Sequence, residues 1–182
     1  MKRLVLTLVG VLALAAPAAL ATSVRDRDDV TTGLDIAKVS GAHNRASDQL
    51  VQTIDFYEAL PAKLPTPSSV CVEIWTRSTP GESPPDYEAC ATHDKSDKWQ
   101  ASIARKRAKG QRLRVGGVKV EQPSDTRLVM RIDPDDIKRP TPYQWRTEAT
   151  SFASDCKSST GCPDYAPDRP GTATTKLSKP RS

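Results

Sequence analysis

The first 21 residues constrain this chain more than any other segment. Lys2 and Arg3 precede an almost wholly apolar run from residue 4 to residue 20, which closes with Ala19-Leu20-Ala21. A basic start, an apolar run and a small-x-small ending are typical of a secretory signal peptide. We therefore predict that residues 1–21 are removed, that the mature chain begins near Thr22, and that the protein is secreted.

The apolar run is too short for a membrane anchor. It has about seventeen residues, whereas a spanning helix needs about twenty. No later stretch is apolar enough to cross a bilayer, and residues 172–182 are polar. We expect a released protein without a membrane span.

All four cysteines follow the predicted cleavage site, and an even number in an exported chain predicts a disulfide framework. We favour Cys71–Cys90, which lie in neighbouring strand-like runs, and Cys156–Cys162, which close a short Ser/Thr/Gly loop. The alternative is a zinc site, but the cysteines lack the paired CxxC spacing of such sites.

Charge and length indicate one domain without a nucleic-acid partner. Without Lys2 and Arg3 the chain has 25 basic and 22 acidic residues, a net charge of +3 against +5 for the full sequence. This mild excess differs from the concentrated basic face of nucleic-acid-binding domains. The remaining 161 residues can bury a single core.

Short alternating runs predict an all-β fold. In residues 70–76 the apolar Val70, Val72 and Ile74 share one face, and residues 125–132 alternate similarly. Turn residues recur about every ten positions, and Gly116-Gly117 indicates a bulge or a turn. We predict an antiparallel, jelly-roll-like β-sandwich of about eight strands at 33–170. A charged lead-in at 22–32 precedes it and a disordered tail at 171–182 follows it.

The acidic opening of the mature chain offers candidate metal ligands. Carboxylate oxygens suit Ca²⁺, and acidic residues near residue 165 can join them if the two ends of the domain meet at one sheet edge. The alternative is a solvated acidic lead. The candidate ligands are Asp26, Asp28, Asp29, Asp35, Asp164 and Asp168.

A basic hairpin and one tryptophan are candidate ligand contacts. The hairpin would attract an anionic polymer, such as an acidic polysaccharide, a wall polymer or a lipid surface. The interpretation that we favour there is an exposed hairpin whose charges prevent edge-to-edge pairing. Trp75 can stack on a sugar ring or pack against the proline-rich loops. The candidate contacts are Trp75, Arg105, Lys106, Arg107, Lys109 and Arg112, with Arg114 beside them.

No catalytic motif is present. The chain has two histidines, His43 and His93, and many serines, but no Gly-x-Ser-x-Gly pattern marks one serine as a nucleophile. We therefore predict no catalytic residues, and a secreted hydrolase stays as an alternative.

Several segments together resemble a family of uncharacterised secreted β-sandwich proteins of actinobacteria. The resemblance covers most of the mature chain and implies no activity. The segments are 28–39, 70–77, 86–90, 143–145 and 162–168.

The acidic opening followed by Leu34-Asp35-Ile36 is also similar to the start of carbohydrate-binding modules of family nine and of DOMON domains. That resemblance covers only the opening and the strand count. It implies sugar or haem binding and, in several members, a structural calcium ion. Such domains hold haem through a methionine with a histidine or lysine, whereas Met130 alternates with Leu128 and Ile132 as core residues do.

Together these features predict a secreted binding or structural module for a polysaccharide or cell-envelope polymer. A secreted hydrolase and a protein–protein interaction or inhibitor domain are the alternatives.

Overall fold

The computed structural model describes residues 21–107 and 110–177, and these form a β-structure with one short 3-10 helix, η2. The predicted signal peptide, apart from Ala21, lies outside the described residues. The strands are β1 (Thr22–Arg25), β2 (Ile36–Asn44), β3 (Gln49–Phe56), β4 (Ser69–Trp75), β5 (Tyr87–His93), β6 (Trp99–Lys106), β7 (Arg112–Ser124), β8 (Arg127–Ile132), β9 (Tyr143–Ser151), β10 (Cys162–Ala166) and β11 (Ala173–Thr175), and η2 is Pro134–Ile137.

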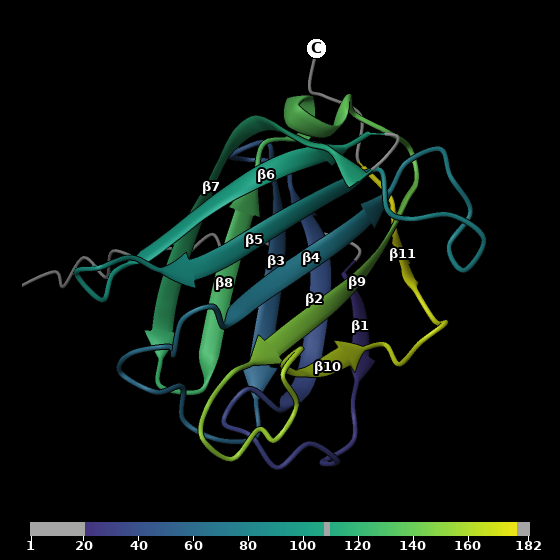
Figure 1. Cartoon of the computed structure of the whole chain (residues 1–182). Coiled ribbons are helices and arrows are strands. Elements are labelled where there is room, and N and C mark those ends of the chain that lie inside the picture. The colour runs from purple at the N-terminus through teal and green to yellow at the C-terminus, as the bar shows by residue number, and fades with distance from the viewer. Residues whose placement is uncertain (1–20, 108–109, 178–182) are drawn as a thin grey trace, which may run out of the picture.

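All strand pairs are antiparallel, and together they form a nearly closed, barrel-like sheet (Figure 1). The order is β1-β2-β3-β8-β7-β6-β5-β4-β9-β10, and β11 pairs with β9. Strands joined by short turns therefore lie side by side, whereas β3 pairs with β8 and β4 with β9 across longer connections.

The long strand β7 joins the two halves of the sheet. Its first half pairs with β6 as far as Gly117, and its second half pairs with β8 from Val118 onward. Ile103 pairs with Gly116 and Ala104 with Arg114, which leaves Val115 as the extra residue of a β-bulge. The predicted irregularity at Gly116-Gly117 is thus a bulge, and bulges bend a strand and increase its twist.

We call the place where β1 and β2 approach β10 and β11 the seam of the barrel. Side-chain hydrogen bonds connect the first strands to the last across this seam. The Thr22 hydroxyl donates to the carbonyl of Thr174 at 2.5 Å. The backbone N–H of Ile36 donates to the carboxylate of Asp164, also at 2.5 Å. Both ends of the domain therefore meet at one place, as the candidate acidic site requires.

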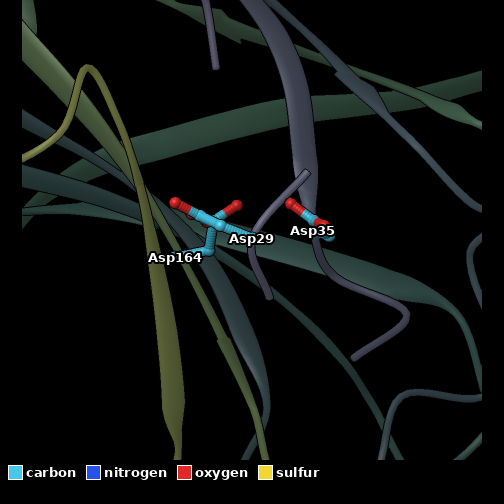
Figure 2. Close-up of side chains that lie close together, drawn as sticks. All are labelled: Asp29, Asp35 and Asp164. Atoms are coloured by element: carbon cyan, nitrogen blue, oxygen red, sulfur yellow. The ribbon is translucent and has the colours of Figure 1, made fainter. Parts of the chain in front are cut away.

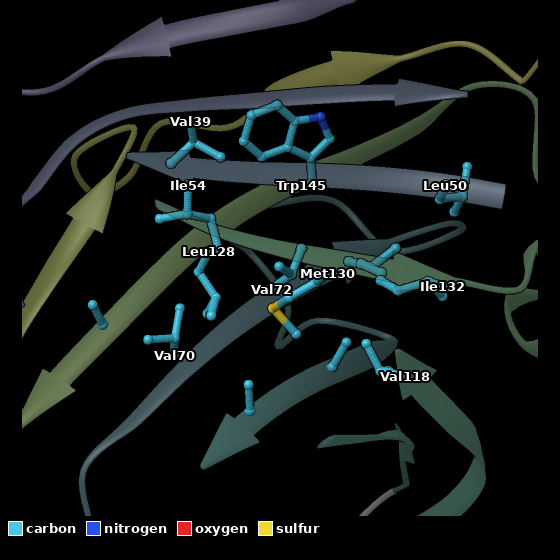
Figure 3. Close-up of a cluster of buried hydrophobic side chains, with 14 of the residues drawn as sticks. Val39, Leu50, Ile54, Val70, Val72, Val118, Leu128, Met130, Ile132 and Trp145 are labelled. Atoms are coloured by element: carbon cyan, nitrogen blue, oxygen red, sulfur yellow. The ribbon is translucent and has the colours of Figure 1, made fainter. Parts of the chain in front are cut away.

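The barrel encloses the apolar core (Figure 3). Alternate residues of β2 and β3 point inward, and Trp145 of β9 is fully buried among them. The predicted inward row of β4 is confirmed, because Val70, Val72 and Ile74 are all fully buried.

The fold class is confirmed as all-β and antiparallel, but the finer prediction was wrong. The described residues form eleven strands rather than about eight, and one bent sheet replaces the two layers of a jelly roll. β1 lies in the segment predicted to be a charged lead-in, and β11 lies in the segment predicted to be a disordered tail. Both strands are very short, with four and three residues, and offer little alternation to detect.

Candidate functional site

Both predicted disulfides are present. Cys71 of β4 lies directly opposite Cys90 of β5, with their Cα atoms 4.0 Å apart. Cys156 and Cys162 close the loop that leads from β9 into β10. The second disulfide therefore restrains the approach to the strand that carries Asp164.

Three of the predicted metal ligands meet at the seam. Asp29 lies in the β1–β2 loop, Asp35 directly precedes β2, and Asp164 is the central residue of β10. One carboxylate oxygen from each lies within 4.8 Å of the others. Figure 2 shows the three side chains gathered where the β1–β2 segment approaches β10.

Burial and hydrogen bonding differ among these three carboxylates. Asp164 is 3% exposed, and its oxygens accept backbone N–H groups from Ile36 at 2.5 Å and Tyr165 at 2.7 Å. Asp35 is 2% exposed, and its buried Oδ1 accepts no hydrogen bond from the described residues. Asp29 is exposed, so the cluster reaches the surface on one side. A buried oxygen without a partner is costly, which makes Asp35 the most unusual member.

The surroundings of Asp35 and Asp164 raise the pKa of both carboxyl groups. Burial, followed by the charges of Asp26 and Asp35, raises the pKa of Asp164 to about 7 against the backbone hydrogen bonds that it accepts. Burial and the neighbouring Asp28 and Asp29 raise the pKa of Asp35 to about 6. Burial is the largest cause of both shifts, and the charges of the neighbouring carboxylates add to it.

The other three predicted ligands surround this group. Asp26 also has a buried carboxylate oxygen without a partner among the described residues, and burial and the charge of Asp168 raise its pKa. Asp28 acts electrostatically on Asp35. The structure thus brings the two ends of the predicted acidic set together, with Asp29, Asp35 and Asp164 as its tightest part.

The basic hairpin, residues 105–114, lies at the β6–β7 turn. Lys106 and Arg112 both form ion pairs with Glu88 of β5, at 2.9 and 2.8 Å. Arg107 and Arg114 are exposed, and Arg105 is half-buried. Lys109 lies outside the described residues. One buried carboxylate therefore balances part of the hairpin's charge, and the other described cations form no ion pair with a described acidic residue.

Trp75 is not an exposed stacking platform, and the prediction of ligand contact there was wrong. The side chain is 3% exposed, and its Nε1–H donates to the carbonyl of Ser83 at 3.1 Å. The indole thus contacts the proline-rich β4–β5 loop through Ser83, which matches the alternative considered from the sequence.

Sequence reasoning missed a buried ion pair beside Trp75. The guanidinium of Arg146 donates to Glu73 at 2.9 and 2.5 Å, and both residues are less than 8% exposed. Arg146 also lies over the rings of Trp75 and Tyr165. Strand alternation places Glu73 on the outer face, where a charged residue is ordinarily solvated. No local sequence pattern therefore predicts that Glu73 is buried.

The histidines are bound in separate local networks. His43 is 2.9 Å from Asp48, which also pairs with Arg139. His93 accepts the N–H of Leu64 at 3.0 Å and lies edge-on to Trp99. Neither arrangement identifies a serine nucleophile.

A small, mostly apolar cavity of about 170 Å³ is lined in part by Gly33 and Leu34, which directly precede Asp35. Residues 59–65 and the end of β9 provide its other walls.

Comparisons with known proteins found no matching family model, no similar curated protein and no similar solved structure. The family resemblance drawn from the sequence therefore stays a prediction. Among the described residues, no helix is long and apolar enough to cross a membrane.

Proposed function

We propose that this protein is an exported binding module that holds an anionic polymer of the cell envelope on its basic hairpin. The observation that carries the proposal is the charge imbalance around Glu88. Two cations share this carboxylate, and the exposed Arg107 and Arg114 have no acidic partner among the described residues. No acidic residue occurs between positions 105 and 114.

The rigid support of the hairpin favours binding to an extended anion. β5 and β6 pair along seven residue positions, and Glu88 fixes Lys106 and Arg112 on one face. Exposed guanidinium groups on such a support can contact carboxylate, sulfate or phosphate oxygens with little loss of backbone freedom. The two disulfides fit the predicted export, because disulfides persist in oxidising compartments.

Co-sedimentation of the oxidised protein with cell-wall material and acidic polysaccharides, at low and high salt, tests the proposal. We expect binding that weakens as salt screens the exposed charges. Replacing Arg107 and Arg114 with glutamine should weaken it by up to about tenfold.

The matched control replaces two exposed arginines elsewhere, Arg45 and Arg77, with glutamine, so that the net charge changes equally. Equal weakening by both double variants would indicate nonspecific attraction and contradict a hairpin site. Absence of binding at both salt concentrations would refute polymer binding.

A further inference from the structure

The acidic group at the seam differs from an ordinary solvated cluster. Asp35 and Asp164 are 2% and 3% exposed, so water cannot stabilise their charges as it does at the surface. No ion pair among the described residues includes either of them or Asp29. The negative charge of the group is thus concentrated without a protein cation.

The unpartnered oxygen of Asp35 is a second, independent indication of a ligand. Its Oδ1 atom is buried and receives no hydrogen bond from the described residues, and the side chain points toward Asp29 and Asp164 (Figure 2). Asp26 contributes another buried oxygen without a described partner close to Asp164. A positive ion at this place would satisfy oxygens for which the fold provides no donor.

The donor set selects the class of ion. All candidate ligand atoms are carboxylate oxygens, which suit hard cations and not the nitrogen- and sulfur-seeking transition metals. Ca²⁺ accepts six to eight oxygens in flexible geometry, whereas Mg²⁺ demands a nearly ideal octahedron. Two of the three side chains lie in the β1–β2 loop and one lies on β10, and the group is open to water on the Asp29 side, so it matches the flexible coordination of Ca²⁺ better than the strict octahedron of Mg²⁺.

We propose that Asp29, Asp35 and Asp164 bind one Ca²⁺ ion, which fastens the β1–β2 loop to β10 and completes the closure of the barrel. Asp35 and Asp164 are separated by 129 sequence positions, and β2 and β10 are not paired through their backbones. The seam there depends on the hydrogen bond from Ile36 to Asp164. A shared ion links both sides directly and offsets the repulsion between them.

Calorimetric titration of the chelator-treated, oxidised protein with CaCl₂ tests the proposal. We expect one Ca²⁺ per chain, with a dissociation constant of about 10⁻⁴ to 10⁻³ M as in other extracellular modules, and weaker binding of Mg²⁺. Asp35→Asn should abolish binding, and Asp29→Asn should weaken it about tenfold. Asp155→Asn, an exposed change outside the cluster, should bind as the unaltered protein does.

Thermal unfolding provides a readout that a purely structural role would not give. In chelator, Asp29→Asn should melt at the same temperature as the unaltered protein or higher, because one repelling charge is removed. In 10 mM Ca²⁺ the order should reverse, because the unaltered protein gains more from the ion. Because Asp29 is exposed, this variant keeps the test decisive if Asp35→Asn fails to fold.

Amide hydrogen exchange tests whether Ca²⁺ links the β1–β2 loop to β10. Ca²⁺ should slow exchange of the Ile36 and Tyr165 amides, both of which donate to Asp164. Binding without added protection at these amides would refute closure of the seam. Absence of saturable binding, or equal Ca²⁺ responses of Asp29→Asn and Asp155→Asn, would refute the site itself.

Discussion

The carboxylate of Asp136 lies directly against the α-carbon of Gly116, where β7 passes from its pairing with β6 to its pairing with β8. A Cβ atom at Gly116 would overlap the carboxylate. Gly116 therefore lets η2 pack closely over the bulge, and no positive φ angle is involved. Burial of Asp136 in this contact raises the pKa of its carboxyl, as do the nearby charges of Asp133 and Asp135.

Gly116→Ala should destabilise the protein by about 1 kcal/mol, because only the end of the Asp136 side chain must move away. Urea unfolding measures this change. Gly117→Ala is the matched control, since no atom lies within 4 Å of the added Cβ. Asp136→Ala should remove most of the penalty in the double variant, and an undiminished penalty there would contradict the overlap as its cause.

Gly41→Ala should be more harmful, because its neighbour is rigid. The added Cβ would lie 2.8 Å from Nε1 of Trp145, a fully buried side chain whose Nε1–H donates to Thr175 at 2.8 Å. Overpacking of this kind costs roughly 1–3 kcal/mol, and displacement of the indole would add the loss of a buried hydrogen bond. Chemical unfolding and tryptophan fluorescence together would detect it. A stability change no larger than that of Gly117→Ala would contradict this prediction.

The buried ion pair of Glu73 and Arg146 should stabilise the fold only while both charges are present. Arg146→Met leaves Glu73 buried without its counter-charge, for which we expect a loss of about 3–5 kcal/mol in the free energy of unfolding. Adding Glu73→Gln should recover part of that loss, which a double-mutant cycle measures. Lys119→Ala breaks an exposed ion pair with Glu121 and should have no measurable effect. Additive losses in the cycle would show that the two charges do not depend on each other.

Local pattern predicted the strands with clear alternation but not the closure of the sheet. Val70, Val72 and Ile74 could be assigned to one face because a strand fixes the direction of successive side chains. Whether two layers or one bent sheet forms depends on β7, which is continuous through Gly116 and Gly117. Two adjacent glycines are equally consistent with a turn, so the sequence left both outcomes open.

Long-range contacts also explain why the sequence predicted only part of the candidate sites. The acidic residues were recognisable by composition, but their assembly depends on β10 meeting the start of β2. Strand alternation places Trp75 on the face opposite to Val72 and Ile74, but it does not predict that the Trp75 side chain is buried there. The eleven-residue β4–β5 loop, 76–86, folds back to the indole and accepts its Nε1–H at Ser83, and no local sequence pattern predicts that contact.

Asp86 anchors that loop, and its charge should make the loop's stability depend on pH. One carboxylate oxygen accepts the backbone N–H groups of Thr76 at 2.7 Å, Arg77 at 2.9 Å and Ser78 at 3.3 Å. Burial acts to raise the pKa of Asp86, but these hydrogen bonds outweigh it and the pKa falls below its ordinary value. Because the pKa is lower in the folded state, this stabilisation is present above about pH 4 and is lost as the pH falls further.

Asp86→Asn should therefore lower the free energy of unfolding by about 1 kcal/mol at pH 7, since the amide oxygen is a weaker acceptor than a carboxylate. Urea unfolding at pH 7, 5 and 3 should show this difference unchanged at pH 5 and reduced at pH 3, because at pH 3 the Asp86 side chain of the unfolded chain becomes protonated. Asp155→Asn, in an exposed position, should show no such dependence. A difference that stays constant down to pH 3 would mean that the variant acts through packing, and that the charge of Asp86 does not hold the loop.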